Sequence, residues 1–137
     1  MSAEVAVRAA VIAALRGDAA LMAGINALFD GEPVRATMPY GVVGECMGAE
    51  WGGKELEGRE VRLTIALLDG GEAPGKLAGW MARVDAVMAG VADAGDEWRI
   101  VTARLVRSRL SRVNRQPMSG WQAVMDYRVR AVRGEGG

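Results

Sequence analysis

Two stretches of the chain show the three-and-four spacing of an amphipathic helix, over residues 3–16 and about 76–91. Ser2 is suited to cap the first helix and Gly17 to end it. Asp18 is suited to cap a further short turn. The apolar stripe of the first helix contains Val7, Val11, Ala14 and Leu15. The stripe of the second contains Leu77, Met81, Val84, Met88 and Val91.

Alternation of apolar with other residues predicts strands in the remaining chain. It is clearest over residues 61–67 and 121–131, where successive side chains point to opposite faces of a sheet. Residues 40–47 are rich in Val and Gly, and residues 98–110 in β-branched side chains, so both also predict strands. The polar stretches 51–59 and 111–120 are expected to connect strands, the second of them within a hairpin.

The order helix, strand, strand, helix, strand, strand predicts an α+β fold. We expect an antiparallel or mixed sheet of four to five strands, two helices packed on one face, and an extended C-terminal hairpin. The other face, with Val124 and Val132 among charged groups, is expected to be uncovered. A length of 137 residues suits one domain, over residues 1–133, and the terminal GEGG at 134–137 is expected to be disordered.

A loop punctuated by Gly and Pro separates the first helical region from the first long strand. It reads FDGEPVRATMPYGVVGE from residue 29 to 45. Pro39 keeps Met38 out of the helical region, which favours a strand beginning at Tyr40. Residues 31–37 then become a candidate contact loop.

Seventeen basic and seventeen acidic residues give a formal net charge of zero. Dedicated nucleic-acid binders usually carry a basic surplus, so the charge argues against that class. Cys46 is the only cysteine, which excludes an intramolecular disulfide and suits a reducing compartment. The N-terminal apolar stretch holds Arg8 and Arg16 at helical spacing and is read neither as a signal peptide nor as a membrane span.

Residues able to carry chemistry are few, and their arrangement predicts no enzyme. The chain has no histidine to activate a serine or to ligate a metal. Its candidate carboxylates lie in or beside Gly-rich segments, without a spacing that places two on one rigid face. We therefore expect no catalytic, metal or cofactor site. The carboxylates considered are Glu45, Glu50, Glu55, Glu57, Asp93, Asp96 and Glu97.

Arginines concentrate between residues 99 and 115, the one run of a single charge. They suit the solvated side of a strand, an interface with acidic loops of a neighbouring subunit, or, third, a DNA-facing surface, which lacks interleaved aromatic residues. For the interface alternative the candidate residues are Arg107, Arg109, Arg112, Arg115, Trp51, Glu55 and Glu57.

The order of these segments resembles a known family. Leu15-Arg16-Gly17-Asp18-Ala19-Ala20-Leu21, Phe29-Asp30-Gly31 with Pro33, and Met38-Pro39-Tyr40-Gly41-Val42-Val43 resemble the N-terminal half of tail-completion or tail-terminator proteins of long-tailed phages and phage-like gene transfer agents. The strand at 61–67, the helix at 77–88 and the pair 104–109 and 121–130 extend the resemblance to about residues 3–133. The chain departs from the family in its four tryptophans.

The resemblance implies a structural subunit without catalytic residues. Such subunits form a ring, commonly sixfold, that caps the head-proximal end of the tail tube, stops its polymerisation and binds the head-completion protein. Double-stranded DNA passes through the lumen, and a neutral subunit would line it without gripping the duplex. The implied location is the head–tail junction of a particle made in the bacterial cytoplasm. Two alternatives stay open: a head-completion protein, and a dimeric ligand-binding regulatory domain.

Overall fold

The computed structural model describes residues 2–115 and 118–134. Within them the chain forms three helices, and one sheet of six strands in the order β1-β2-β3-β6-β5-β4. The helices are α1 (Ala3–Arg16), α2 (Ala19–Gly24) and α3 (Gly75–Gly90). The strands are β1 (Leu28–Asp30), β2 (Tyr40–Gly53), β3 (Leu56–Asp69), β4 (Asp93–Ala94), β5 (Trp98–Arg115) and β6 (Met118–Arg133).

The α+β class, the mixed sheet and the extended C-terminal hairpin are confirmed. The sheet is mixed because β1 pairs parallel to β2, whereas the other neighbouring strands are antiparallel. The numbers of elements were wrong: the described residues hold six strands rather than four to five, and three helices rather than two. The additional elements have two, three and six residues, which is too short for a periodic pattern to be visible.

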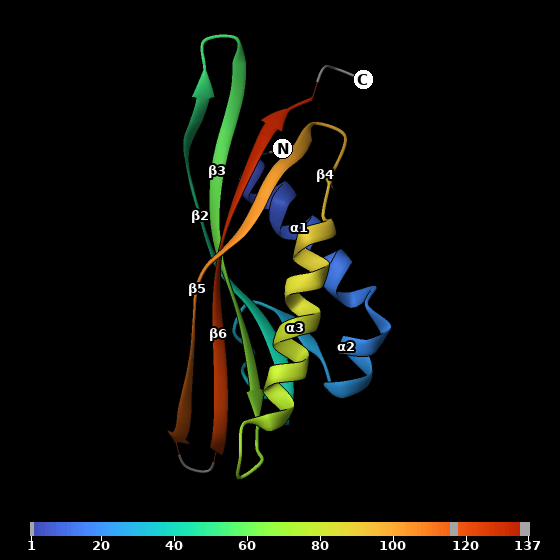
Figure 1. The fold of residues 1–137 in the computed structure, drawn as a ribbon, viewed down its shortest axis with the longest axis vertical. Coiled ribbons are helices and arrows are strands. Elements are labelled where there is room, and N and C mark those ends of the chain that lie inside the picture. The colour runs from blue at the N-terminus through green and yellow to red at the C-terminus, as the bar shows by residue number, and fades with distance from the viewer. Residues whose placement is uncertain (1, 116–117, 135–137) are drawn as a thin grey trace.

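The four long strands extend well beyond their predicted ends. Residues 51–59, expected to be an exposed connection, complete the β2–β3 hairpin, in which Gly53 pairs with Leu56. Residues 111–115 likewise continue β5 and pair with β6. Gly and charged residues there suggested loops, but pairing with a neighbouring strand outweighs their low strand propensity. The two hairpins reach opposite ends of the molecule (Figure 1).

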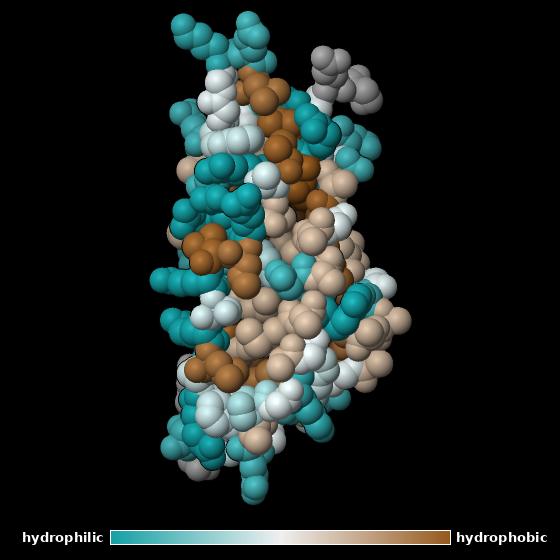
Figure 2. All heavy atoms as spheres, in the orientation of Figure 1, coloured by the Kyte–Doolittle hydropathy of each residue, from teal (hydrophilic) through white to brown (hydrophobic). Residues whose placement is uncertain are grey.

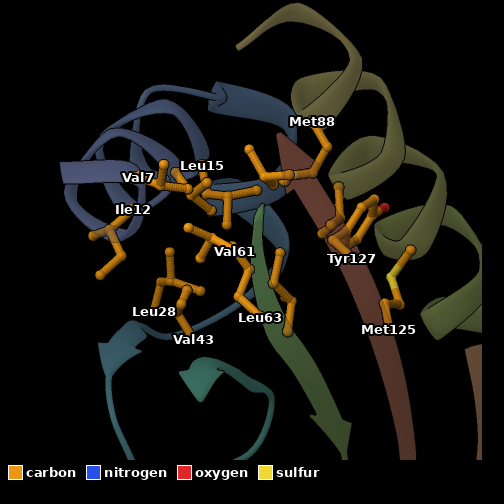
Figure 3. Close-up of a cluster of buried hydrophobic side chains, with 14 of the residues drawn as sticks. Val7, Ile12, Leu15, Leu28, Val43, Val61, Leu63, Met88, Met125 and Tyr127 are labelled. Carbon is orange, nitrogen blue, oxygen red and sulfur yellow. The ribbon is translucent and has the colours of Figure 1, made fainter. Parts of the chain in front are cut away.

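All three helices lie on one face of the sheet (Figure 1). The inward-pointing residues of β3 are essentially inaccessible: Val61, Leu63, Ile65 and Leu67 have exposed fractions of 0 to 2 %. They pack against α1 side chains such as Val7 and Leu15 and, farther along, against α3, so that side chains of the sheet, α1 and α3 converge (Figure 3). Period-2 alternation in the strands and 3.6-residue periodicity in the helices therefore meet in one core, as the sequence predicted.

Hydrogen bonds from Asn26 stabilise residues 37–39, which lie directly before β2. The Asn26 side chain donates to the carbonyls of Thr37 and Met38, at 2.9 and 3.2 Å, and the Met38–Pro39 peptide bond is cis. The strand begins at Tyr40, as Pro39 predicted.

The expectation of an uncovered second face was partly wrong. A small cluster of Tyr40, Val42, Leu68 and Val113 is buried on that face under the segment around Phe29 and Met38. The aromatic rings of Phe29 and Tyr40 meet edge to face, with centroids 5.7 Å apart. Val124 and Val132 are also buried rather than exposed. Only the tertiary structure brings residues 29–38 across this face.

The expected disorder of residues 134–137 concerns mainly 135–137, which lie outside the described residues. Gly134 is described, and its backbone N–H donates to the carbonyl of Glu97 at 2.6 Å.

Candidate functional site

The sheet face opposite the helices carries a concentration of charge, which we call the outer face. Strand pairing places Glu60 beside Arg130 and Asp126 beside Arg107 on this face. Outward-pointing arginines outnumber the carboxylates there, so the face is basic although the whole chain is neutral. These arginines are Arg62, Arg99, Arg104, Arg107, Arg109, Arg128 and Arg130.

Asp126 accepts hydrogen bonds from the strands on both sides of β6. Thr64 donates its hydroxyl to Oδ1 at 2.8 Å, and Arg107 Nε donates to Oδ2 at 2.7 Å, which ties β3, β6 and β5 together. The Arg107 hydrogen bond is the main reason that the pKa of Asp126 lies below its usual value, and the Thr64 hydrogen bond adds to it. A groove of about 280 Å³ adjoins this group and includes Glu45, Met47 and Arg62.

This lowered pKa predicts an acid-dependent part of the stability. The ionised form of Asp126 is favoured in the folded state, so its contribution is present above the unfolded-state pKa near 3.8 and is lost as the pH falls through the folded-state pKa. D126N should therefore lose less unfolding free energy than the wild type between pH 7 and pH 3, measured by urea denaturation. D93N, at an exposed position with no ion pair to a described residue, is the control; equal pH dependence in wild type and D126N would contradict the prediction.

Glu60 holds a second group of arginines. Its carboxylate accepts a hydrogen bond from Arg130 Nε at 3.1 Å and lies 3.7 Å from Arg62 Nε and 3.9 Å from Arg128 Nε. The Arg128 Nε atom is buried and has no hydrogen-bond partner among the described residues, because 3.9 Å is too long for a hydrogen bond. One carboxylate thus partly neutralises three cations at the middle of the face.

Three tryptophans lie under arginine side chains. Arg133 lies 4.7 Å from the Trp98 ring centroid. The corresponding distances are 5.2 Å for Arg130 and Trp51 and 5.5 Å for Arg112 and Trp121. A cation over an aromatic face is attracted by the ring's quadrupole, so these pairs give the unusual tryptophans a structural role.

The interface residues predicted from sequence fall into three separate places. Trp51, Glu55 and Glu57 lie at the β2–β3 hairpin end, where Glu57 already accepts from Arg133 at 3.0 Å. Arg107 and Arg109 point from the middle of β5 onto the outer face, and Arg112 points to the helix side at the other end. The backbone of Arg115 pairs with Met118; its side chain lies outside what the structure describes.

The two hairpin ends therefore do not meet within one chain. Strand pairing places Trp51 opposite Val132 of β6, through Gly58 of β3, and places Arg112 opposite Trp121 of β6. Trp121 and Val132 are eleven residues apart, so the two positions are separated by roughly 36 Å along the sheet at 3.3 Å per residue. A contact between the arginines of β5 and Glu55 or Glu57, as predicted from sequence, would therefore require a second copy of the chain.

Arg8 is a contact residue that sequence reasoning missed. It projects from α1 to the margin of β2, where its guanidinium donates to the carbonyls of Val43, at 2.6 Å, and Gly44, and to Asp30 at 2.6 Å. Glu4, one turn earlier, accepts from Arg59 at 3.2 Å. Two charged residues four apart beside a buried stripe were the available signal, since i and i+4 share a helix face.

The described residues contain no group of three or more acidic, cysteine or histidine side chains placed to hold a metal ion. None of the helices in residues 2–115 and 118–134 combines the length and hydrophobicity needed to cross a lipid bilayer. Tyr127 donates to Asp85 on α3 at 2.9 Å, and its burial, with that carboxylate, raises its pKa far above the usual value. This bond joins α3 to β6 and belongs to the core.

A family model described as tail completion protein gp17 matches residues 9–131. The chain belongs to this family. A solved chain from the virion of a native gene transfer agent particle has the same fold, with a TM-score of 0.80 and 23% sequence identity, over 98% of this chain and 100% of that one. A comparison with curated protein sequences found no match.

Membership of the tail completion family gives the chain a structural role in a phage or phage-like particle and makes it a non-enzymatic protein. Its functional site is thus a surface rather than a catalytic pocket. In this tail completion protein the candidate surfaces for assembly are the charged outer face and the margins of the sheet. Figure 2 shows hydrophilic groups along the left side of the view, where the sheet lies, with small hydrophobic patches among them.

Proposed function

We propose that this protein is a tail terminator: a ring, with six copies, that caps the head-proximal end of the tail tube. In this role it stops polymerisation of the tube and binds the head-completion protein at the head–tail junction. The observation that carries the proposal is the family match over residues 9–131. The assembly unit is residues 1–133, made in the cytoplasm of the bacterial host.

The surface chemistry supports assembly with protein partners. The candidate contacts are the hairpin-end residues Trp51, Glu55 and Glu57 and the arginines Arg107, Arg109, Arg112 and Arg115. Arginine suits such contacts because its planar guanidinium pairs with carboxylates through two parallel hydrogen bonds. Arg109 has no ion pair with a described residue, whereas Arg107 also holds Asp126.

Double-stranded DNA passes through the lumen of this ring without specific binding. The chain has no net charge, and Glu60 and Asp126 partly neutralise the arginines around them. Affinity for a duplex rises with the number of phosphates neutralised, so this balance keeps the attraction weak. A weakly attractive wall suits a conduit through which DNA must move.

Deleting the gene tests the proposal. Electron microscopy of particles made without this protein should show abnormally long tails or tails not joined to heads, because tube growth is no longer stopped and the docking surface is missing. Supplying the wild-type chain from a plasmid should restore normal tails.

Tails of normal length joined to heads in the deletion strain would overturn the proposal. Fractionation adds a second criterion: the protein should co-purify with tails made in a strain lacking heads. Its recovery with heads and absence from tails would assign it to head completion instead.

A further inference from the structure

Within the part of the chain that the structure describes, two strands have long stretches of backbone without a strand partner on one side, one at each margin of the sheet. β2 pairs with β1 only over Gly41–Val43, and Arg8 covers the next carbonyl; over residues 45–53 its described partner is β3 alone. β5 pairs with β4 only at its first two residues, so residues 101–115 have β6 as their described partner. Such edges are ready templates for pairing with another chain.

Strand direction allows these two margins to pair between copies. The four long strands β2, β3, β6 and β5 are successively antiparallel, so β5 runs opposite to β2. When a second copy is placed beside the first by rotation, its β2 meets the β5 of the first copy in antiparallel orientation. The alternation then continues from copy to copy without interruption.

The charges of the two margins are complementary. Residues 45–53 of β2 contain Glu45 and Glu50 and no basic residue, whereas residues 101–115 of β5 contain five arginines and no acidic residue. Charges on an edge strand usually oppose pairing with other chains, but the opposite charges of these two margins oppose only the pairing of like margins. Pairing of β5 with β5, or of β2 with β2, brings like charges together, and only the pairing of β5 with β2 brings opposite charges together.

Exposed apolar side chains concentrate on the same margins. Leu110 is 47% exposed and Met47 is 59% exposed, although each lies among charged neighbours on a strand. Val101, Leu105 and Val106 on β5 are also exposed. A merely solvated edge has no need of this apolar surface, whereas an interface buries it beside its charged contacts.

We propose that β5 of one copy hydrogen-bonds along β2 of the next copy, so that the sheets of successive subunits join edge to edge. This inference rests on the ring proposed above. The contact is heterologous, because two different patches meet, and repetition of such a contact builds a ring when the rotation between copies closes, whereas a twofold dimer needs the same patch on both copies. It identifies the partner of the arginine-rich strand as the glutamate-bearing strand of a second copy.

Strand pairing also predicts which residues meet. Ala49 pairs with Glu60, Glu60 with Arg130, and Arg130 with Thr102, so Ala49 and Thr102 stand at one level of the sheet on its outer face. A pure rotation about an axis along the strands keeps this level. Tilt of the strands in a closed ring shifts the register by steps of two residues on the same face.

Disulfide trapping in assembled tails tests the contact. In a C46S background, A49C is combined in turn with T102C, R104C, R109C or S111C, and tails purified from complemented cells are oxidised. One of these pairs should give a ladder of covalent multimers on a denaturing gel. The matched control is A49C with A86C, which lies exposed on α3 and should give no ladder.

Charge reversal gives an independent readout. R104E/R109E and E45R should each reduce incorporation into tails by about tenfold or more, since loss of about 1.4 kcal/mol of charge complementarity corresponds to a factor of ten. Glu45 is chosen because it lies on the same face of the sheet as Arg104 and Arg109, whereas Glu50 points to the helix side. Combining the three substitutions restores opposite charges across the contact and should recover incorporation. Far-UV circular dichroism of each purified variant checks that it folds.

The outcomes separate this inference from the ring itself. Normal tails with the protein incorporated, but without a ladder from any cysteine pair and without rescue by the combined reversal, would overturn edge pairing and leave the terminator role intact. Absence of the wild-type protein from tails would overturn both.

Discussion

Gly120→Ala is expected to lower the free energy of unfolding by about 3 to 5 kcal/mol, the sum of backbone strain and forced displacement of packed chain. Gly120 has φ +156°, and a Cβ built on it would lie 2.1 Å from the carbonyl oxygen of Asp69 and 2.8 Å from Cα of Gly70. Both obstacles are backbone atoms and cannot rotate away. The end of β3 would have to separate from β6, which disrupts the pairing of Asp69 with Trp121.

Urea denaturation at pH 7 measures the effect, with Gly79→Ala as the matched control. Gly79 lies exposed inside α3, with no atom within 4 Å of its added Cβ. Alanine there should stabilise the protein by up to about 1 kcal/mol through higher helix propensity. Equal effects of the two substitutions would show that the close approach at Gly120 does not limit stability.

Arg8→Met should cost about 2 to 3 kcal/mol, the second largest effect that we expect. Methionine keeps an apolar stem of similar length but removes the donors that reach Val43, Gly44 and Asp30. Hydrogen bonds from a charged group are worth roughly 1.5–3 kcal/mol each. The expected loss is smaller than the sum for three such bonds for two reasons. The Val43 carbonyl keeps the hydrogen bond from the Gly31 N–H, and the site of the Arg8 side chain, which is 21% exposed, is open to water that can bind the other acceptors.

Arg16→Met is the control for this prediction, again by urea denaturation. Arg16 follows Arg8 by eight residues on α1 and donates to one carbonyl, that of Leu28, at 2.8 Å. Its loss should cost only about 1 kcal/mol, because Arg16 is exposed and water can replace the lost hydrogen bond. A loss for Arg8→Met no larger than that for Arg16→Met would contradict the role of Arg8 in covering the margin of β2.

Local patterns were reliable where a long element has one buried face. The first helix was predicted over residues 3–16 and occupies them, since its apolar stripe, Ser2 and Gly17 give consistent signals. The alternation at 121–131 likewise identified the buried face of β6, including Ala123, Met125 and Tyr127. Each of these signals is contained within a few residues of sequence.

Strand ends and short strands could not be predicted in this way. β1 and β4 exist because β2 and β5 offer them backbone partners, and residues 51–53 are extended because residues 56–58 lie opposite. Arg8 gives no sign in the sequence that its partners lie 35 and 36 residues away. Pairing over such separations depends on which segments the whole chain brings together.

The candidate assembly surface also combines features that the sequence predicts with features that only the structure shows. The run of arginines from 99 to 115 and the family resemblance were visible in the sequence, and the family match confirms the resemblance. The sequence could not show that Arg107 is held by Asp126, that Arg112 points to the opposite face, or that the arginines border an unpaired edge. Bulges in β5 between Ile100 and Thr102 and between Leu105 and Arg107 shift the alternation, so facing cannot be counted from one end of the strand.

The sequence by itself determined the α+β class, the two principal amphipathic helices, the inward face of the long strands and the family. Hydrophobic periodicity and the residues that begin and end helices act locally, so a linear pattern records them. The tertiary structure decided the strand order β1-β2-β3-β6-β5-β4, the full length of the hairpins and the two margins that, within the described residues, are paired over only part of their length. These features depend on which backbone groups find hydrogen-bond partners across the sheet, and distant parts of the chain supply those partners.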